Sequence, residues 1–200
     1  MNLRNKIRGS AIQVVKRLVD NGHEAYIVGG AVRDLLLGYT PKDVDITTSA
    51  TPEQVREVFG RRQCIIIGRR FRLAHVRMGD EIYEVSTFRR EPTAEERRGR
   101  LDDDGEMIWN DNQFGTLEDD AMRRDFTVNA LYFDPIGERG IIDLVGGRED
   151  LKNKVVRVIG DAKTRFIEDP VRMLRALKLV GMYGFSMTQD TEEALKEKRG

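Results

Sequence analysis

The sequence has a single cysteine, Cys64, among 200 residues. A lone cysteine cannot form an internal disulfide or a C-x-x-C metal or redox site, and it is typical of a protein kept in a reducing cytoplasm. The chain also lacks an apolar run approaching the roughly 20 residues that span a bilayer. Residues 1–19 interleave basic and apolar side chains, which predicts an amphipathic helix and not a signal peptide. No membrane partner is therefore expected.

The chain has no net charge, because 34 Lys and Arg balance 34 Asp and Glu. Any affinity for nucleic acid must then come from local patches, and the charges are indeed segregated. Residues 61–100 hold eleven arginines against six acidic residues, whereas residues 101–120 hold eight acidic residues and no basic one. The acidic run is most simply a solvated face. Residues 89–115 are predicted to form a long mobile loop.

The length fits one ordinary domain, or one domain plus the start of a second, and 40% hydrophobic residues suffice for a core. The pattern predicts an α+β fold with a central sheet of about five strands and helices packed against it. Predicted strands cover 25–28, 44–46, 63–67, 71–78, 81–87, 129–133 and 155–159. Predicted helices cover 1–19, 31–37, 51–59 and 170–182, the last with Met173, Leu174, Leu177 and Val180 facing inward.

Local signals fix several of these boundaries. Thr51-Pro52-Glu53-Gln54 has an N-cap, a proline at the first helical position and a glutamine three residues after the cap, so it predicts a capping box. Gly38 stands where a left-handed C-terminal cap is needed. Gly79-Asp80 is predicted to form a hairpin turn between two strands.

Asp43-Val44-Asp45-Ile46 carries the first chemical signal. Side chains alternate along a strand, so both carboxylates are expected on one face while Val44 and Ile46 are buried. Two such carboxylates repel each other unless cations lie between them, and oxygen ligands suit Mg²⁺. Two ions held this way can clamp the attacking and leaving oxygens of a phosphoryl transfer. An isolated D-x-D is more often a turn or a strand end, so its context matters.

Gly29-Gly30 breaks the preceding strand and leads directly into a helix that carries Arg33. Glycine backbone lets phosphates approach exposed N–H groups, and an arginine in the first turn adds charge. The sequence does not match the G-x-G-x-x-G pattern of dinucleotide sites. The residues therefore favour a triphosphate cradle beside the carboxylates. The plainer alternative is a glycine turn with a solvated Arg33.

Three segments together carry a family resemblance: Ala25–Gly38 followed by Asp43-Val44-Asp45, then Arg123–Ala130, then Glu168–Ala176. In this order they resemble the motifs of bacterial poly(A) polymerases and tRNA CCA-adding enzymes, which form the class II family of template-independent nucleotidyltransferases. The resemblance covers roughly residues 23–185. It implies a polymerase β-like nucleotidyltransferase head with a mixed sheet over residues 1–160. Residues 161–200 would begin a helical neck domain that is cut short.

The resemblance also implies roles for individual residues. Asp43 and Asp45 would hold two Mg²⁺ ions and activate the 3′-hydroxyl of an RNA primer, while Asp125 would complete the acidic site or fix the sugar. Glu84 is a second candidate for the third carboxylate. The triphosphate and ribose would be bound by residues of the glycine turn and of the Arg-Arg-Asp motif, namely Gly29, Gly30, Arg33, Arg123 and Arg124. Taken alone, Arg-Arg-Asp would be a surface ion-pair cluster.

In the neck motif, Asp169, Arg172, Arg175 and Lys178 recur every three residues and are predicted to line one helical face. In the family, the aspartate and the first arginine read the edge of the incoming base. Adenine needs an acceptor for its amino group and a donor for its ring nitrogen, which Asp169 and Arg172 can supply. Arg175 would bind the nucleotide beside them. The alternative is an ordinary i,i+3 ion pair.

Residues 65–76 separate the two branches, since Gly68-Arg69-Arg70-Phe71-Arg72 resembles the poly(A) polymerases and would grip RNA phosphate near the primer. The expected function is addition of AMP from ATP to RNA 3′ ends. CCA or A addition to tRNA is the second interpretation, and a non-catalytic nucleotide or RNA binder is the third. The sequence does not reveal the preferred RNA, the oligomeric state or any RNA-degradation or RNA-chaperone partner.

Overall fold

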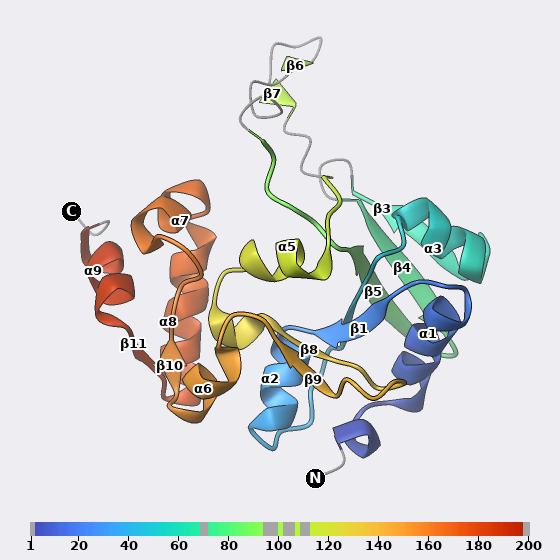
Figure 1. Cartoon of the computed structure of the whole chain (residues 1–200), viewed down its shortest axis with the longest axis horizontal. Helices are drawn as coiled ribbons and strands as arrows, with labels where there is room; N and C mark the ends of the chain where they lie inside the picture. Colours follow the sequence, from blue (N-terminus) through green and yellow to red (C-terminus); the bar gives the residue numbers. More distant parts are fainter. Residues whose placement is uncertain (1–2, 69–71, 94–99, 102–106, 109–112, 198–200) are drawn as a thin grey trace.

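A seven-stranded mixed sheet organises the protein (Figure 1). The computed structural model describes residues 3–68, 72–93, 100–101, 107–108 and 113–197. In spatial order the strands are β3 (Cys64–Ile67), β4 (Leu73–Met78), β5 (Glu81–Thr87), β2 (Asp45–Thr48), β1 (Ala25–Val28), β8 (Leu131–Phe133) and β9 (Ile141–Asp143). Neighbours are antiparallel except β2 and β5, which are parallel. The predicted α+β class with a mixed sheet is confirmed.

One face of the sheet packs against three helices, α1 (Gly9–Asp20), α2 (Gly30–Leu36) and α3 (Pro52–Phe59). Alternation along the strands decides which residues reach them: Ile27 and Ile46 are fully buried in this core. The other face is covered only in part, by α5 (Leu117–Met122), which packs on Val28 and Tyr132. Over β3 and β5 this face is open, because Ile65 and Ile82 on it are 64% and 58% exposed.

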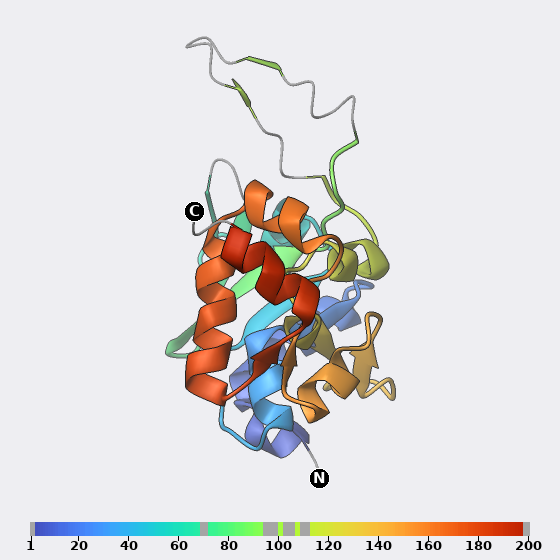
Figure 2. The same ribbon diagram turned by 90° about the vertical axis from the view of Figure 1, so that its left-hand side faces the viewer.

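The C-terminal part is helical (Figure 2). It contains α6 (Gly147–Lys152), α7 (Ala162–Glu168), α8 (Val171–Tyr183) and α9 (Gln189–Glu197). Between them, β10 (Val155–Val156) pairs in parallel with β11 (Ser186–Met187). Helix α8 packs on α7 and on this small sheet through the buried Ala176 and Leu179. The remaining elements are short: 3₁₀ turns at Leu3–Lys6 and Thr127–Asn129, and strands β6 (Arg100–Leu101) and β7 (Met107–Ile108).

The local boundary signals are confirmed. Thr51 and Gln54 form both halves of the capping box at the start of α3. After α2, Gly38 adopts φ 90° and donates to Leu35 O, while Tyr39 N donates to Asp34 O at 2.8 Å. This pair of bonds is a Schellman cap, and only glycine takes such a φ without strain. Gly79 also has a positive φ, as the tight turn between β4 and β5 requires.

Several predicted ranges were wrong. The N-terminal helix begins at Gly9, because Arg8 is extended and separates it from the turn before it. The strand predicted at 155–159 is only two residues long and lies outside the main sheet. The sheet has seven strands and not five, since β9 and the ordering of β8 beside β1 were not anticipated. Helices α5, α6 and α7 were also missed; each has only six or seven residues.

The inward face predicted for α8 was partly wrong. Leu174 is 66% exposed and Leu177 is 40% exposed, whereas Ala176 and Leu179 are buried. Apolar residues occur all round this helix, so hydrophobicity alone did not identify its packed side.

The predicted loop at 89–115 is described only in part. Arg89 and Phe114 form an isolated bridge at its base, and β6 pairs with β7. The acidic residues 102–104 and the two arginines 69–70 lie outside the described residues. Within the described ranges, no helix is both long and apolar enough to cross a membrane.

Candidate active site

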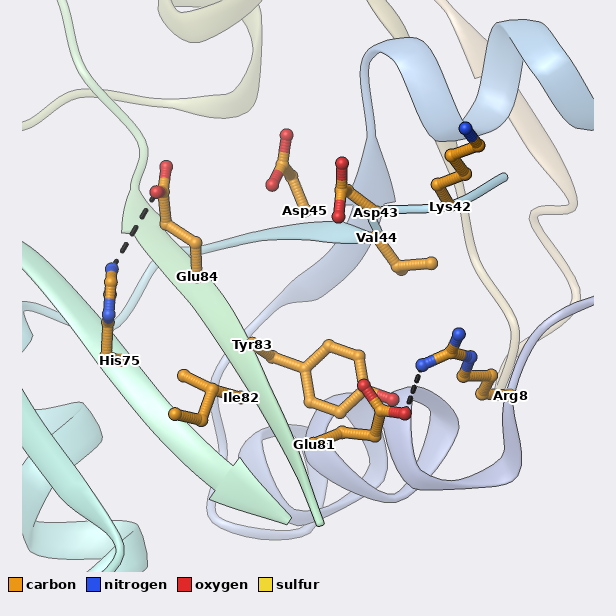
Figure 3. A pocket seen from close by; sticks show the side chains of 10 residues that line it. All are labelled: Arg8, Lys42, Asp43, Val44, Asp45, His75, Glu81, Ile82, Tyr83 and Glu84. Atoms are coloured by element: carbon orange, nitrogen blue, oxygen red, sulfur yellow. Dashed lines mark ion pairs between the residues drawn. The ribbon is translucent and has the colours of Figure 1, made fainter.

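Three carboxylates lie together on the open part of the sheet (Figure 3). Asp45 begins β2, and Glu84 lies beside it on the parallel strand β5, since Ile46 pairs with Val85. Asp43 precedes the strand in a bend, so the prediction that it lies on the strand was wrong. Its side chain nevertheless points the same way as that of Asp45, with the buried Val44 between them. A hollow of about 270 Å³ opens beside the three carboxylates.

The electrostatics of this row suit a cation. Loss of hydration, and then the negative charge of Glu84, raise the pKa of Asp45, although Arg124 opposes the shift. Among the described residues, neither Asp43 nor Asp45 has a hydrogen bond or ion pair from its side chain, and Glu84 has only His75 at 3.8 Å. Hard carboxylate oxygens are what Mg²⁺ prefers. The chemistry of these donors therefore fits the expected metal. In the described chain, however, no three His, Cys, Asp or Glu side chains are close enough together to coordinate one ion.

The glycine turn brings the basic half of the site next to this row. Gly29 has φ 74°, and a Cβ there would lie 3.8 Å from Arg124 Nη1 and 3.7 Å from Asn129 O. The backbone of the turn thus runs close to Arg124, whose charge also acts on Asp45. The structure brings the first two sequence motifs together, as predicted from their chemistry.

Arg124 is held by a buried cluster at the end of α5. Its Nε and Nη2 donate to Asp120 Oδ2 at 3.1 and 2.9 Å, and Tyr132 donates to the same oxygen at 2.8 Å. The Arg89 backbone N–H satisfies Asp120 Oδ1 at 3.2 Å. Burial alone would lower the pKa of Arg124, but Asp120 and Tyr132 together outweigh burial and raise that pKa. Arg124 therefore stays charged.

Asp120 is the most buried acid of the site, with 1% of its surface exposed. Burial would raise the pKa of Asp120, yet Arg124 and Arg123 outweigh burial and lower it. Arg123 lies 3.7 Å away, its Nε buried without a hydrogen bond, and burial lowers its pKa. Sequence reasoning missed Asp120 and Tyr132. The available signal was the spacing of four between Asp120, in α5, and Arg124, just after the end of that helix.

Arg33 is largely enclosed. Its guanidinium donates to Asp34 Oδ1 from Nε and Nη2, to Asn129 Oδ1 from Nη1 at 2.7 Å, and to Tyr183 OH from Nη2 at 3.0 Å. It also lies 4.6 Å from the centre of the Tyr183 ring. Four of its five N–H groups are used, so one N–H of Nη1 is left for a ligand.

The neck motif meets Asp125. Arg175 Nη1 donates to Asp125 Oδ2 at 3.2 Å, and Arg175 Nη2 lies 3.6 Å from Asp169. Asp169 precedes α8, where its Oδ1 accepts from Val171 N at 3.1 Å, so it does not lie on the helix as predicted. Arg172 Nε is 3.8 Å from Asp169, and its Nη1 donates to Arg165 O. Burial and the charge of Arg165 lower the pKa of Arg172.

The predicted residues thus form two groups. Glu84 stands beside Asp45, whereas Asp125 stands in the neck network with Arg175. Lys178 is exposed and takes no part in that network.

Comparison with known proteins identifies the family to which this chain belongs. Residues 25–157 match the family described as the poly A polymerase head domain. The chain is 49% identical over 194 residues to poly(A) polymerase I of Escherichia coli, covering 96% of this chain and 41% of that protein. It is 44% identical to the CCA-adding enzyme of Lactobacillus helveticus over 187 residues, covering 94% of this chain and 44% of that enzyme.

Among solved structures, the CCA-adding enzyme of Bacillus stearothermophilus in complex with CTP matches with a TM-score of 0.76 at 39% identity, covering 94% of this chain and 43% of the other. The fold is therefore that of a nucleotidyltransferase head domain. This chain belongs to the poly(A) polymerase head-domain family. It spans less than half the length of the relatives it matches.

Proposed function

We propose that this chain carries the catalytic head of an enzyme that adds AMP from ATP to the 3′ ends of RNA, a poly(A) polymerase. The observation that carries the proposal is the row of Asp43, Asp45 and Glu84 on the open face of the sheet, in which neither aspartate side chain has a hydrogen bond or ion pair within the described chain. Beside it, Arg124 is fixed next to the backbone of Gly29. An acidic row facing a fixed guanidinium suits transfer of a nucleotidyl group.

In the proposed reaction, the 3′-hydroxyl oxygen bonds to the α-phosphorus of ATP, the bond from that phosphorus to the β-phosphate breaks, and pyrophosphate leaves. The hydroxyl proton passes to solvent water as the new bond forms. Two Mg²⁺ ions, when bound, would acidify the hydroxyl and offset the charge on the phosphates. Asp43 and Asp45 would hold them, with Glu84 as the adjacent carboxylate. Arg124 would bind phosphate oxygens, with Gly29, Gly30, Arg33 and Arg123 lining the same side.

Base selection is assigned to Asp169 and Arg172. Asp169 Oδ2 accepts no hydrogen bond in the described chain, although Arg175 Nη2 and Arg172 Nε lie 3.6 and 3.8 Å from it. Arg172 Nε has no hydrogen bond partner there either. An acceptor and a donor side by side match the edge of adenine. Arg175 holds Asp169 in place from the other side.

CCA addition to tRNA is the second candidate, supported by the 44% identity to a CCA-adding enzyme and by the match to a structure with CTP. The two activities share the same transfer step. They differ in the nucleotide accepted and in the length of the product.

Primer extension distinguishes the candidates. The chain is incubated with Mg²⁺ and either ATP or CTP, on an unstructured RNA and on a tRNA that lacks its CCA end, with Asp45→Ala and Asp80→Asn as variant and control. Asp80 is an exposed aspartate of the β4–β5 turn. A long ladder from ATP on both primers, lost in Asp45→Ala and kept in Asp80→Asn, is the expected result. Addition of one to three nucleotides to the tRNA alone would establish CCA addition, and no extension would indicate a truncated or non-catalytic module.

A further inference from the structure

Helix α8 is attached to the sheet domain at two points. Near its start, Arg175 donates to Asp125 at 3.2 Å, and at its end Tyr183 donates to Asp34 at 3.0 Å. Eight residues separate the two points, which is about 12 Å along a helix axis. A helix fixed at one point can pivot, whereas a helix fixed at both has its tilt and rotation set. Arg172 lies on this helix, one turn before Arg175.

Asn129 links the two attachment points by hydrogen bonds. Its Oδ1 accepts from Arg33 Nη1 at 2.7 Å, and its Nδ2 donates to Asp125 Oδ1 at 3.2 Å. The hydrogen bonds therefore form one closed circuit through Tyr183, Arg33, Asn129, Asp125 and Arg175, completed by α8 itself. Only a side chain with both an acceptor and a donor can join a guanidinium to a carboxylate in this way.

Tyr183 holds the other side of the same guanidinium. Its hydroxyl accepts from Arg33 Nη2 at 3.0 Å and donates to Asp34, while its ring lies against the guanidinium at 4.6 Å. Besides Asp34, its neighbour in α2, Arg33 is thus held by Asn129 of the sheet domain and by Tyr183 of α8. A movement of α8 would therefore change the position of the Arg33 guanidinium, on the phosphate side of the site.

We propose that Asn129 and Tyr183 are positioning residues that couple the phosphate side of the site, at Arg33, to the helix that carries the base-selecting Arg172. This inference rests on the proposed function, since it concerns the same nucleotide site. Neither residue needs to touch the substrate. Their effect is to keep α8 in the one orientation in which Asp169 and Arg172 meet the base of a nucleotide whose phosphates lie near Arg33.

The test measures the preference for ATP over CTP in two independent ways. Steady-state primer extension gives kcat and KM for each nucleotide, and titration calorimetry without primer gives the two dissociation constants. The variants are Asn129→Ala, Asn129→Asp and Tyr183→Phe. The controls are Asn153→Asp, an exposed amide bound only to Glu149, and Tyr39→Phe, an exposed phenol whose ring touches Tyr183.

Tyr183→Phe should raise the KM and dissociation constant for ATP about fivefold with little change in kcat, because one hydroxyl is lost and the ring stays. Asn129→Ala should cost about tenfold or more. The preference for ATP over CTP should fall in both. Asn129→Asp should be as harmful as Asn129→Ala, because a carboxylate accepts from Arg33 but cannot donate to Asp125. In the double variant Asn129→Ala/Tyr183→Phe, the loss of ATP affinity should be smaller than the product of the two single losses, because both residues act on the Arg33 guanidinium.

Three outcomes would overturn the coupling. The first is an ATP-to-CTP preference that is unchanged in both assays while only the melting temperature falls. The second is wild-type ATP affinity in Asn129→Asp. The third is a double variant whose loss of ATP affinity equals the product of the two single losses. Failure of the wild type to extend any primer would instead contradict the proposed function. The binding preference measured by calorimetry would still decide the coupling in that case.

Discussion

The acidic row on the open face and the cluster at the end of α5 contain the same kinds of side chain in opposite states. Asp45 is exposed, has no hydrogen bond partner in the described chain, and its pKa is raised. Asp120 is buried, bonded to Arg124, Tyr132 and a backbone N–H, and its pKa is lowered. The difference is that the Asp45 carboxylate is open to a ligand from solution, whereas the Asp120 carboxylate holds a neighbour in place.

Asp45→Asn should produce the largest effect, and on activity alone. Primer extension should fall about 10³-fold, because stabilisation of several kcal/mol by bound metal is lost. The melting temperature should stay the same or rise, since repulsion from Glu84 is relieved. Steady-state kinetics and thermal unfolding measure the two quantities. A variant with more than a tenth of wild-type activity would show that Asp45 does not act as assigned.

Asp120→Ala should mainly reduce stability. Breaking a buried ion pair leaves Arg124 uncompensated, which costs about 3–5 kcal/mol of unfolding free energy. Urea denaturation measures this loss. The matched control is Asp20→Ala, which removes an exposed pair with Lys16 and should cost less than about 1 kcal/mol. Equal losses in the two variants would mean that the buried cluster is not a framework for Arg124.

The smallest effect is a difference in how the free energy of unfolding depends on pH. It is measured without Mg²⁺ by comparing Asp45→Asn and Asp120→Asn with the wild type. The ordinary pKa of both aspartates is 3.8. The pKa of Asp45 is raised in the folded state, so Asp45→Asn should gain stability relative to wild type as pH rises above that value. The pKa of Asp120 is lowered, so its stabilising effect is complete above 3.8 and lost as pH falls below it. The penalty of Asp120→Asn should therefore shrink in acid. Parallel pH curves for the two variants would contradict the contrast between the two aspartates.

Local rules predicted the parts of the fold that depend on a few adjacent residues. The capping box at Thr51 and the left-handed cap at Gly38 follow from backbone chemistry within one turn, and both are present. The short helices α5 and α6 were missed because six residues give too little periodicity to recognise. The burial of α8 was misjudged because apolar residues occur all round this helix, so hydrophobicity alone did not identify its packed side.

The candidate active site also contains residues that could be predicted from the sequence and residues that could not. Asp43, Asp45 and Arg124 could be predicted from motifs. Asp120 could not, because in the sequence it is one of eight acids in a run of twenty, and only the fold buries it. Tyr183 could not either, since nothing near it in the sequence links it to Arg33.

The hydrogen bond between Arg33 and Tyr183 also sets an order of events during synthesis, because it joins residues 150 positions apart. A ribosome adds about 5–20 residues per second, so Arg33 exists for on the order of ten seconds before Tyr183 is made. Asn129 is made during that interval, 96 positions after Arg33. The sheet with its acidic row can therefore form on the ribosome before α8 has been made, and the nucleotide site proposed above is complete only when α8 emerges.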